Sequence, residues 1–222
     1  MNAQAIPSLV ARFRAEYRAA EIPPSYSGIL HFLFTSTTAL AVIGLSLGRL
    51  HSITPVEWSV IPLTFLYANL VEYMGHKGPM HRPVRLLRTL FVRHTLQHHR
   101  FFTHEAMAYE GTQDYKMVLF PPVMILFFVG LHAVPVGVLL YYLTTSNVAY
   151  LFVATAIGYF LTYEWLHFAY HLREDSLPGR LPLMKTLRRL HTEHHDPALM
   201  SNYNFNITFP IGDYLFGTRY KP

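Results

Sequence analysis

The longest uncharged stretch of this chain constrains its fold more than any other feature. The 47 residues from Met117 to Tyr163 include no Asp, Glu, Lys or Arg. A helix needs about 20 apolar residues to cross a bilayer, so this stretch is long enough to cross twice. The polar run 144–147 is the natural turn. The pattern therefore predicts two spans, at roughly residues 118–143 and 148–168.

Prolines complicate the first of these two spans. Three of them should kink or delay the helix: Pro121, Pro122 and Pro135. A re-entrant hairpin, which enters and leaves the membrane on one side, is the alternative for this segment.

Two earlier apolar segments are also candidate spans. Residues 29–47 are uncharged and long enough to cross, and they contain Gly44, which with Gly48 forms a small-residue pattern typical of close helix contacts. Residues 58–71 cross only if the helix continues past Glu72 towards Gly75. Hydrophobic residues make up 51% of the chain and charged residues 14%, against about 25% charged in soluble domains. The sequence thus predicts an all-α integral membrane bundle of about four transmembrane helices.

The basic residues gather on one side of these spans. Only Arg49 falls on the other side, and the remaining lysines and arginines are Arg12, Arg14, Arg18, Lys77, Arg82, Arg85, Arg88, Arg93, Arg100, Lys116, Arg173, Arg180, Lys185, Arg188, Arg189, Arg219 and Lys221. The positive-inside rule predicts a multi-pass protein with both termini and the middle loop in the cytoplasm. This accounts for the net charge of +5 without nucleic acid, whose binding would need aromatic or base-reading residues among the arginines.

The first 28 residues do not read as a secretory signal, because arginines interrupt them and no apolar run ends at a small-residue cleavage site. Apolar residues recur at helical spacing after Pro7: Leu9, Val10, Phe13 and Tyr17. We expect an amphipathic helix, either interfacial or packed on a cap. The chain then divides, as a single domain, into an N-terminal interfacial segment, two spans, a cytoplasmic histidine-rich loop, two more spans and a cytoplasmic tail: 1–28, 29–75, 76–116, 117–168 and 169–222.

Histidines are concentrated in the two cytoplasmic segments. Eleven of the 14 lie within residues 76–104 and 167–195. Ten of them form four groups of regular spacing: His76 and His81; His94, His98 and His99; His167 and His171; His191, His194 and His195. Two amphipathic helices are expected, at residues 83–91 before His94 and at residues 182–190 before His191. The buried face of each helix then carries leucines in its first part and histidines where it continues into the histidine group.

Metal binding explains this pattern better than core packing does. A lone histidine is usually a core residue with a satisfied ring, and we assign that role to His31, His51 and His132. Ten converging imidazoles without a metal would repel when protonated and leave ring nitrogens unpaired when neutral. The absence of cysteine excludes thiolate zinc sites and iron–sulfur clusters. We therefore predict a helical cap that holds a histidine-rich dimetal site.

Ten ligands are too many for one ion, so two ions are expected. All-imidazole ligation suits Zn, Fe, Cu or Ni. A closed structural zinc site has only four ligands, and the larger number of histidines here favours redox-active iron. Nearby acids are expected behind the ligands, where they would orient imidazoles through the far ring nitrogen: Glu72, Glu164, Glu193 and Asp196. His104 is expected in a similar supporting or substrate-side role. No catalytic side chain beyond the metal ligands is expected.

These histidine groups resemble those of the fatty acid hydroxylase/sterol desaturase superfamily of membrane di-iron enzymes. The resemblance covers about residues 60–219 and extends beyond the histidines to Tyr115–Val118, Pro121–Pro122, Asn204–Phe205, Thr208–Pro210, Asp213 and Leu215–Thr218. Residues around the third group are most similar to the fatty acid 2-hydroxylase branch: Gly158–Tyr159, Tyr163–Glu164, His167–Phe168 and His171.

The resemblance implies a monooxygenase that hydroxylates a lipid acyl chain drawn from the bilayer. Two iron ions, which zinc displaces readily at nitrogen sites, would use O2 as co-substrate with two external electrons. The chain has no Gly-x-Gly-x-x-Gly and no haem attachment motif, so a cytochrome b5- or ferredoxin-type donor with its reductase is expected as partner. Two alternatives remain open: a sterol or carotenoid desaturase or hydroxylase, and a membrane metal transporter or sensor.

Overall fold

The computed structural model describes residues 6–221, and within them the protein is built of helices without a β-strand. The α-helices are α1 (Ser8–Glu21), α2 (Gly28–Leu47), α3 (Pro55–Trp58), α4 (Val60–Gly75), α5 (Arg88–Phe91), α6 (His99–Phe101), α7 (Tyr115–Val118), α8 (Val123–Phe127), α9 (Val134–Leu143), α10 (Ser146–Tyr170), α11 (Pro182–His194) and α12 (Ile211–Leu215). Wide π-helical turns occupy His76–Met80, Val92–His98 and Phe128–Ala133, and tight 3-10 turns occupy Arg85–Leu87, Thr112–Asp114 and Pro178–Arg180.

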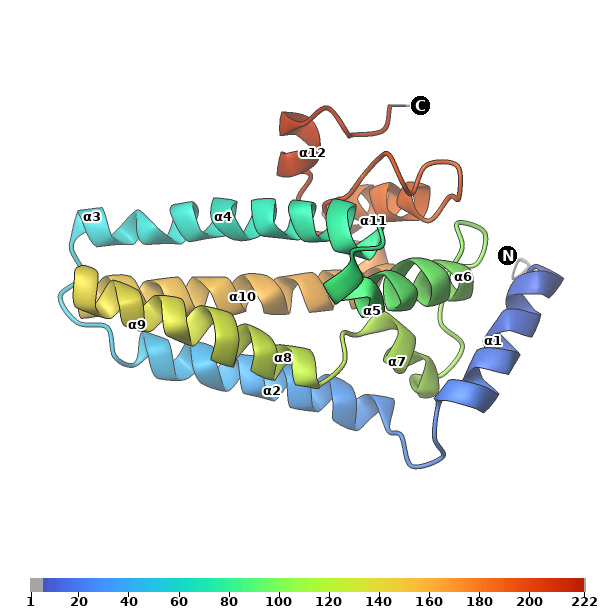
Figure 1. Ribbon diagram of the computed structural model, residues 1–222, viewed down its shortest axis with the longest axis horizontal. Coiled ribbons are helices and arrows are strands. Elements are labelled where there is room, and N and C mark those ends of the chain that lie inside the picture. Colours follow the sequence, from blue (N-terminus) through green and yellow to red (C-terminus); the bar gives the residue numbers. More distant parts are fainter. Residues whose placement is uncertain (1–5, 222) are drawn as a thin grey trace.

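Four long helical segments lie side by side, namely α2, α4, α8 with α9, and α10 (Figure 1). Helix α10 is the central one and packs against α2, α4 and α9. Its sequence has no polar face, and residues all around it are buried, as expected of a helix enclosed by others. Ile157 and Phe160 of α10 form the core of the bundle with Ala39 and Ile125.

The proline-rich third segment behaves as the sequence predicts. Helix α7 ends at Val118, Pro122 caps the next helix, and the chain is then helical to Leu143 through one π-turn. This segment is about 30 Å long and lies along α10 (Figure 1), so it forms no re-entrant hairpin. Helix α9 ends at Leu143 and Thr145 caps α10, which confirms the predicted turn.

The small-residue pattern in α2 does not make the expected close contact. A Cβ added at Gly44 would meet no atom within 4 Å, because this glycine faces outward. The close approach lies instead at Gly28, where a Cβ would stand 1.9 Å from the carbonyl oxygen of Thr112. Glycine is therefore required where the start of α2 meets the histidine-bearing end of the bundle.

Two helical stretches are long and apolar enough to cross a membrane, Gly28–Leu47 and Thr112–Leu143. Helix α4 has only 16 residues. Helix α10 has 25 residues but carries tyrosines, threonines and Glu164 among its apolar residues. The membrane-spanning count of four therefore stays a prediction.

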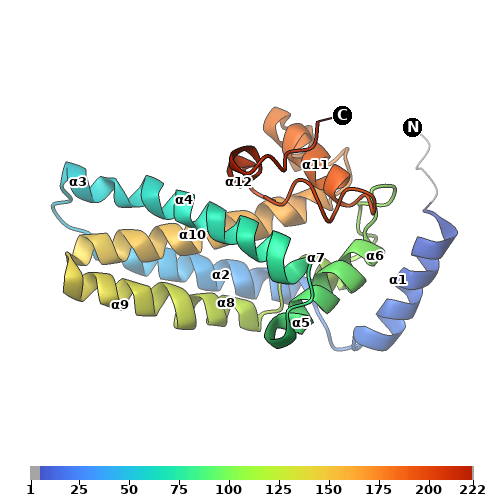
Figure 2. The same cartoon turned by 45° about the horizontal axis from the view of Figure 1, so that its top comes forward.

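Helix α3 precedes α4 at one end of the bundle, and the remaining helices α1, α5, α6, α7, α11 and α12 gather toward the other end and form a cap (Figures 1 and 2). Helix α1 packs against α6 through Val10, Arg14 and Tyr17, which are buried. Of the two alternatives for the N-terminal amphipathic helix, this contact corresponds to packing on the cap. In the cap, α11 spans the predicted segment, whereas the other predicted helix, 83–91, becomes α-helical only at Arg88.

Glu57 ties together the loops at the opposite end of the bundle. Its carboxylate accepts hydrogen bonds from the Thr54 backbone N–H (2.7 Å), the Thr145 hydroxyl (2.6 Å) and the Asn147 amide (3.3 Å). The hydrogen bond from Thr145, with those from Thr54 and Asn147, lowers the pKa of Glu57 from 4.5 to about 2. The carboxylate thus joins the start of α3 to the turn before α10.

Replacing Glu57 with Gln should lower the midpoint of thermal unfolding at pH 7, because the amide cannot accept all of these bonds. A carboxylate with a lowered pKa stabilises the fold above its unfolded pKa, and this contribution is lost as pH falls through the folded value. The difference between the wild-type protein and Glu57→Gln should therefore shrink between pH 4.5 and about 2. Thermal unfolding followed by circular dichroism in detergent measures this difference in midpoint at each pH. Glu105→Gln, at an exposed position, is the control. A difference that did not change with pH would contradict the prediction.

Candidate metal centre

The structure brings the ten predicted histidines together where the bundle meets the cap. Every one of these side chains is buried, with 7% or less of its surface exposed: His76, His81, His94, His98, His99, His167, His171, His191, His194 and His195. They come from the segment between α4 and α7 and from the C-terminal ends of α10 and α11, which are far apart in sequence.

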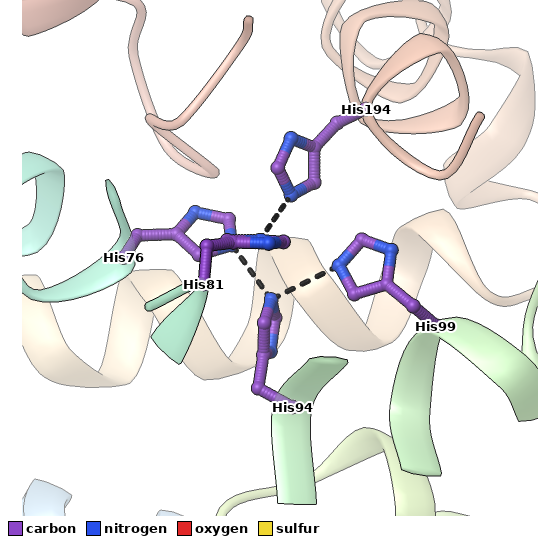
Figure 3. A group of neighbouring side chains, drawn as sticks. All are labelled: His76, His81, His94, His99 and His194. Atoms are coloured by element: carbon purple, nitrogen blue, oxygen red, sulfur yellow. Dashed lines mark hydrogen bonds between the residues drawn. The ribbon is translucent and has the colours of Figure 1, made fainter. Parts of the chain in front are cut away.

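The first cluster contains five of these rings, from His76, His81, His94, His99 and His194 (Figure 3). One nitrogen from each ring lies within 4.8 Å of the corresponding nitrogens of all the others. The Nε2 atoms of His76 and His94 are 2.7 Å apart, those of His81 and His194 are 2.9 Å apart, and those of His94 and His99 are 3.1 Å apart.

The second cluster contains His98, His171, His191 and His195, with His167 beside them. Five Nε2–Nε2 distances of 3.1–3.3 Å connect these rings into a closed circuit. Ligands at right angles to one another and about 2.2 Å from one ion would lie about 3.1 Å apart. The spacing of the second cluster therefore fits nitrogen ligands around one metal ion.

Local helix geometry divides neighbouring histidines between the two clusters. The turn at Val92–His98 is π-helical, with hydrogen bonds from residue i to residue i+5, and is therefore wider than an α-helical turn. In this geometry His94 and His99, five residues apart, both join the first cluster, whereas His98 joins the second. In α11, His191 and the following His195 share one face at four-residue spacing, whereas His194 reaches the first cluster. Each adjacent pair, 98–99 and 194–195, thus supplies one ring to each cluster.

Backbone carbonyls hold the far ring nitrogens. Five rings place their Nδ1 atom within hydrogen-bonding reach of a backbone carbonyl oxygen. The pairs are His76 with Phe205, His98 with Met117, His171 with Met107, His194 with Tyr203, and His195 with Phe102. A carbonyl only accepts, so each of these imidazoles carries its proton on Nδ1 when neutral. Their Nε2 lone pairs then point into the clusters, which is the arrangement of metal-bound histidines.

Burial keeps these imidazoles neutral. It lowers the pKa of His98 to about 3 and that of His194 to about 4, against an ordinary value near 6.5. Burial, together with neighbouring imidazoles, holds the pKa of His94, His99 and His195 well below the ordinary range. Converging lone pairs without protons leave buried acceptors unsatisfied unless a cation joins them, so the donor set fits two metal ions.

The acids expected behind the ligands have other partners. Glu72 accepts from the backbone N–H (3.0 Å) and hydroxyl (2.6 Å) of Thr208, and Glu193 accepts from Asn204 (3.0 Å). Glu164 accepts from the Phe120 N–H (3.3 Å), and Asp196 from that of Ala198 (2.8 Å).

Across residues 6–221, none of these four carboxylates hydrogen-bonds a ring nitrogen of the ten histidines, and His104 is exposed. The expectation that acids orient the imidazoles directly is therefore wrong. Carbonyl oxygens accept the same protons without burying a charge. Because a carbonyl belongs to every residue, no sequence signal distinguishes the ones used here.

Thr95 also supports the first cluster, although the sequence alone does not assign it this role. Its hydroxyl oxygen lies 3.3 Å from Nδ1 of His81 and donates to the carbonyl of Met80 (2.7 Å). The only signal available was a hydroxyl beside His94. Of the three lone histidines, only His31 is the buried core residue expected: it hydrogen-bonds Tyr26 and the Phe120 carbonyl. His51 is exposed and reaches only the Arg49 carbonyl, so its predicted core role is wrong, and His132 is half-buried and stacks on Tyr67.

A cavity of about 210 Å³ opens beside both clusters. His94 of the first cluster and His98 and His167 of the second line its inner wall. The other lining residues are mostly apolar: Met80, Thr89, Leu90, Arg93, Met117, Val118, Leu119, Phe120, Pro121, Val123, Met124 and Tyr163. The Arg93 guanidinium donates to the carbonyls of Lys116 and Leu119, which satisfies part of its hydrogen-bonding capacity in this wall.

These features define a class: a helical protein whose buried histidines form two adjacent clusters that could hold metal ions, with an apolar cavity beside them. The chain belongs to the fatty acid hydroxylase family, whose family model matches residues 61–218. Membership implies an oxidoreductase that hydroxylates a lipid. The match confirms the resemblance seen in the sequence.

A solved structure supports the fold. The chain is similar to full-length Scs7p, of which only the hydroxylase domain is visible, with a TM-score of 0.60 and 22% sequence identity. The match covers 88% of this chain and 67% of that one. At this identity the likeness concerns the fold alone. A search of the curated proteins found no match.

Removing metal should destabilise the protein. A ligand at a thousandfold excess over its dissociation constant stabilises a fold by about 4 kcal/mol, which corresponds to about 10 °C in unfolding temperature for a chain of this size. We expect chelator-treated protein to melt lower by this order and to recover with Zn²⁺ or Fe²⁺ but not with Mg²⁺, which prefers oxygen ligands. Equal melting temperatures with and without Zn²⁺ would contradict the assignment.

Proposed function

We propose that this protein is a membrane-bound di-iron monooxygenase that hydroxylates a lipid acyl chain. The observation that carries the proposal is the pair of neutral imidazole clusters beside one apolar cavity. The ten buried histidines are the proposed ligands, five for each ion. A structural zinc site needs only four closed ligands, whereas a redox enzyme needs its metals accessible from a substrate cavity, which favours iron.

The proposed reaction consumes one O2, two electrons and two protons, and converts a C–H bond to C–OH with release of one water. Bound iron would supply the oxygen activation and redox chemistry that no amino-acid side chain provides. The chain's own residues bind the ions, hold the imidazoles through backbone carbonyls and line the cavity with apolar side chains that exclude water. Electrons would come from an external cytochrome b5- or ferredoxin-type donor with its reductase, because the sequence contains no nucleotide-binding or haem attachment motif.

The lining of the cavity supports a lipid substrate. Apolar side chains such as Leu119, Phe120 and Met124 line the same cavity as His98 and His167. An acyl chain bound against these side chains would therefore lie beside both clusters, as the acyl-chain assignment requires.

Exposed apolar side chains support a membrane location. Large hydrophobic residues on the outer faces of α2, α4 and the segment from α8 to α9 are exposed, including Leu45 (71%) of α2, Leu63 (64%) of α4 and Leu131 (71%) of the π-turn between α8 and α9. Such a surface is unfavourable in water. Helix α10 lies inside the bundle, so it needs less apolar character than a lipid-facing helix. We propose four spans, with the clusters and both termini on the cytoplasmic side where the basic residues lie.

The product identifies the activity. Purified protein loaded with Fe²⁺ under anaerobic conditions is supplied with a reducing system, isotopically labelled O2 and a lipid extract, and the lipids are measured by mass spectrometry. We expect one labelled oxygen atom in an acyl chain. A sterol or carotenoid that loses two hydrogens instead, or no turnover with two irons bound, would overturn the proposal.

One ligand from each cluster should be essential for turnover. Replacing His98 or His194 with Ala removes a metal ligand from the second or the first cluster, respectively. We expect loss of the labelled product and less bound iron by elemental analysis in both variants. Turnover retained in either variant would contradict the assignment of that residue.

Filling the cavity should separate substrate access from metal binding. Met124 lines the cavity, whereas Leu126 on the same helix is 55% exposed. We expect Met124→Trp to keep its two irons and to lose at least about 1.4 kcal/mol of transition-state stabilisation, a tenfold fall in kcat/KM. Leu126→Trp is the matched control and should turn over like the wild-type protein. Unchanged activity of Met124→Trp would exclude this cavity as the acyl-chain site.

A further inference from the structure

One loop of the cap supplies two of the carbonyls that hold the second cluster. The loop 101–109 follows α6, and its Phe102 carbonyl accepts from His195 Nδ1 (2.6 Å). Its Met107 carbonyl accepts from His171 Nδ1 (2.7 Å), and its Tyr109 N–H donates to the His171 carbonyl (3.0 Å). The orientation of these two rings therefore depends on the conformation of this loop.

Arg14 of α1 binds the same loop from the other side. Its guanidinium donates to the carbonyls of Phe101 (2.8 Å), Ala106 (2.6 Å) and Ala108 (3.1 Å). The side chain is fully buried, with 0% exposed, and its guanidinium carbon lies 5.1 Å from the centre of the Phe101 ring and 5.3 Å from that of Phe102.

The carbonyls bound by Arg14 alternate with those that hold the imidazoles. Phe101 precedes Phe102, and Ala106 and Ala108 flank Met107 on both sides. Each peptide group is planar, so fixing the carbonyls of neighbouring residues restricts the direction of the carbonyl between them. Burying an arginine is costly without full hydrogen bonding. Here the side-chain hydrogen bonds of Arg14 all go to carbonyls of this loop, while Glu110, just after the loop, lies 3.7 Å away as an opposite charge.

We propose that Arg14 is a positioning residue for the second cluster, and that α1 is thereby part of the metal site. This inference rests on the proposed binding of two ions. Arg14 touches no histidine of the cluster. It acts through the loop 101–109, whose carbonyls set the directions of His171 and His195. Helix α1 lies before residue 61, where the family match begins.

The first cluster has a separate support of the same kind. Asp213 accepts hydrogen bonds from the backbone N–H groups of Phe205 (2.9 Å) and Asn206 (2.8 Å). The Phe205 carbonyl accepts from His76, and the Tyr203 carbonyl accepts from His194 (2.9 Å). Arg14 and Asp213 therefore brace different loops, and each loop serves a different cluster.

The independence of the two supports makes the role of Arg14 testable. Metal-stripped full-length protein in detergent is titrated with Zn²⁺ in competition with a chromophoric chelator, for the wild type, Arg14→Lys, Asp213→Asn and the double variant. Lysine keeps the charge but lacks the planar fork that reaches three carbonyls. Arg12→Lys is the matched control, because Arg12 lies on the same helix with its side chain 78% exposed. Arg14→Gln is a second variant at the same position.

The wild-type protein and Arg12→Lys should bind two ions. In Arg14→Lys and in Asp213→Asn, one ion should bind as in the wild type and the other about 10–100-fold more weakly, as for other residues behind metal ligands. In the double variant both ions should weaken, because the two variants affect different ions.

Three outcomes would overturn the proposal: two ions bound normally by Arg14→Lys, one ion still bound normally by the double variant when each single variant weakens one ion, or loss of helical circular dichroism in both Arg14→Lys and Arg14→Gln. The last would make Arg14 a general support of the fold. A wild-type protein that binds fewer than two ions would instead refute the proposed function, so the two failures are distinguishable.

Discussion

The structure depends on one electrostatic constraint: ten buried, neutral imidazoles converge, and their ring nitrogens face one another. Burial excludes protonation as a solution, because it pushes the pKa of these rings far below 7. The remaining solution is to commit Nδ1 to a hydrogen bond and leave Nε2 for a cation. Backbone carbonyls do this for five of the rings without adding charge.

The two halves of the protein have different tasks. The bundle encloses α10, which delivers His167 and His171 to the second cluster and exposes apolar outer helices to what we propose is lipid. The cap supplies the other eight rings and the acceptors behind them. The cavity lies where these halves meet, beside His94, His98 and His167. The proposed lipid substrate would therefore be bound at this junction, next to both clusters.

The sequence predicted the large elements well and the polar detail poorly. Apolar periodicity and capping residues are local signals, so the extent of α2, the delay of α8 by Pro122 and the turn before α10 could be read in advance. The stretch before His94 was read as an amphipathic helix, yet Leu86 is 91% exposed and the helix starts only at Arg88. Glu72 was expected to touch an imidazole. It instead binds the backbone of Ile207 and Thr208, near the Phe205 carbonyl that holds His76.

The sequence by itself determined which ten histidines converge, because a residue type that is costly to bury without a partner occurs at regular spacing beside apolar spans. Only the tertiary structure decided which rings share a cluster. A π-helical turn pairs His94 with His99 rather than His98, and this departure from α-helical geometry has no counterpart in the spacing. The same holds for Arg14, whose partners are carbonyls about 90 residues further along the chain. Backbone groups are identical at every position, so their use can be known only once the chain is folded.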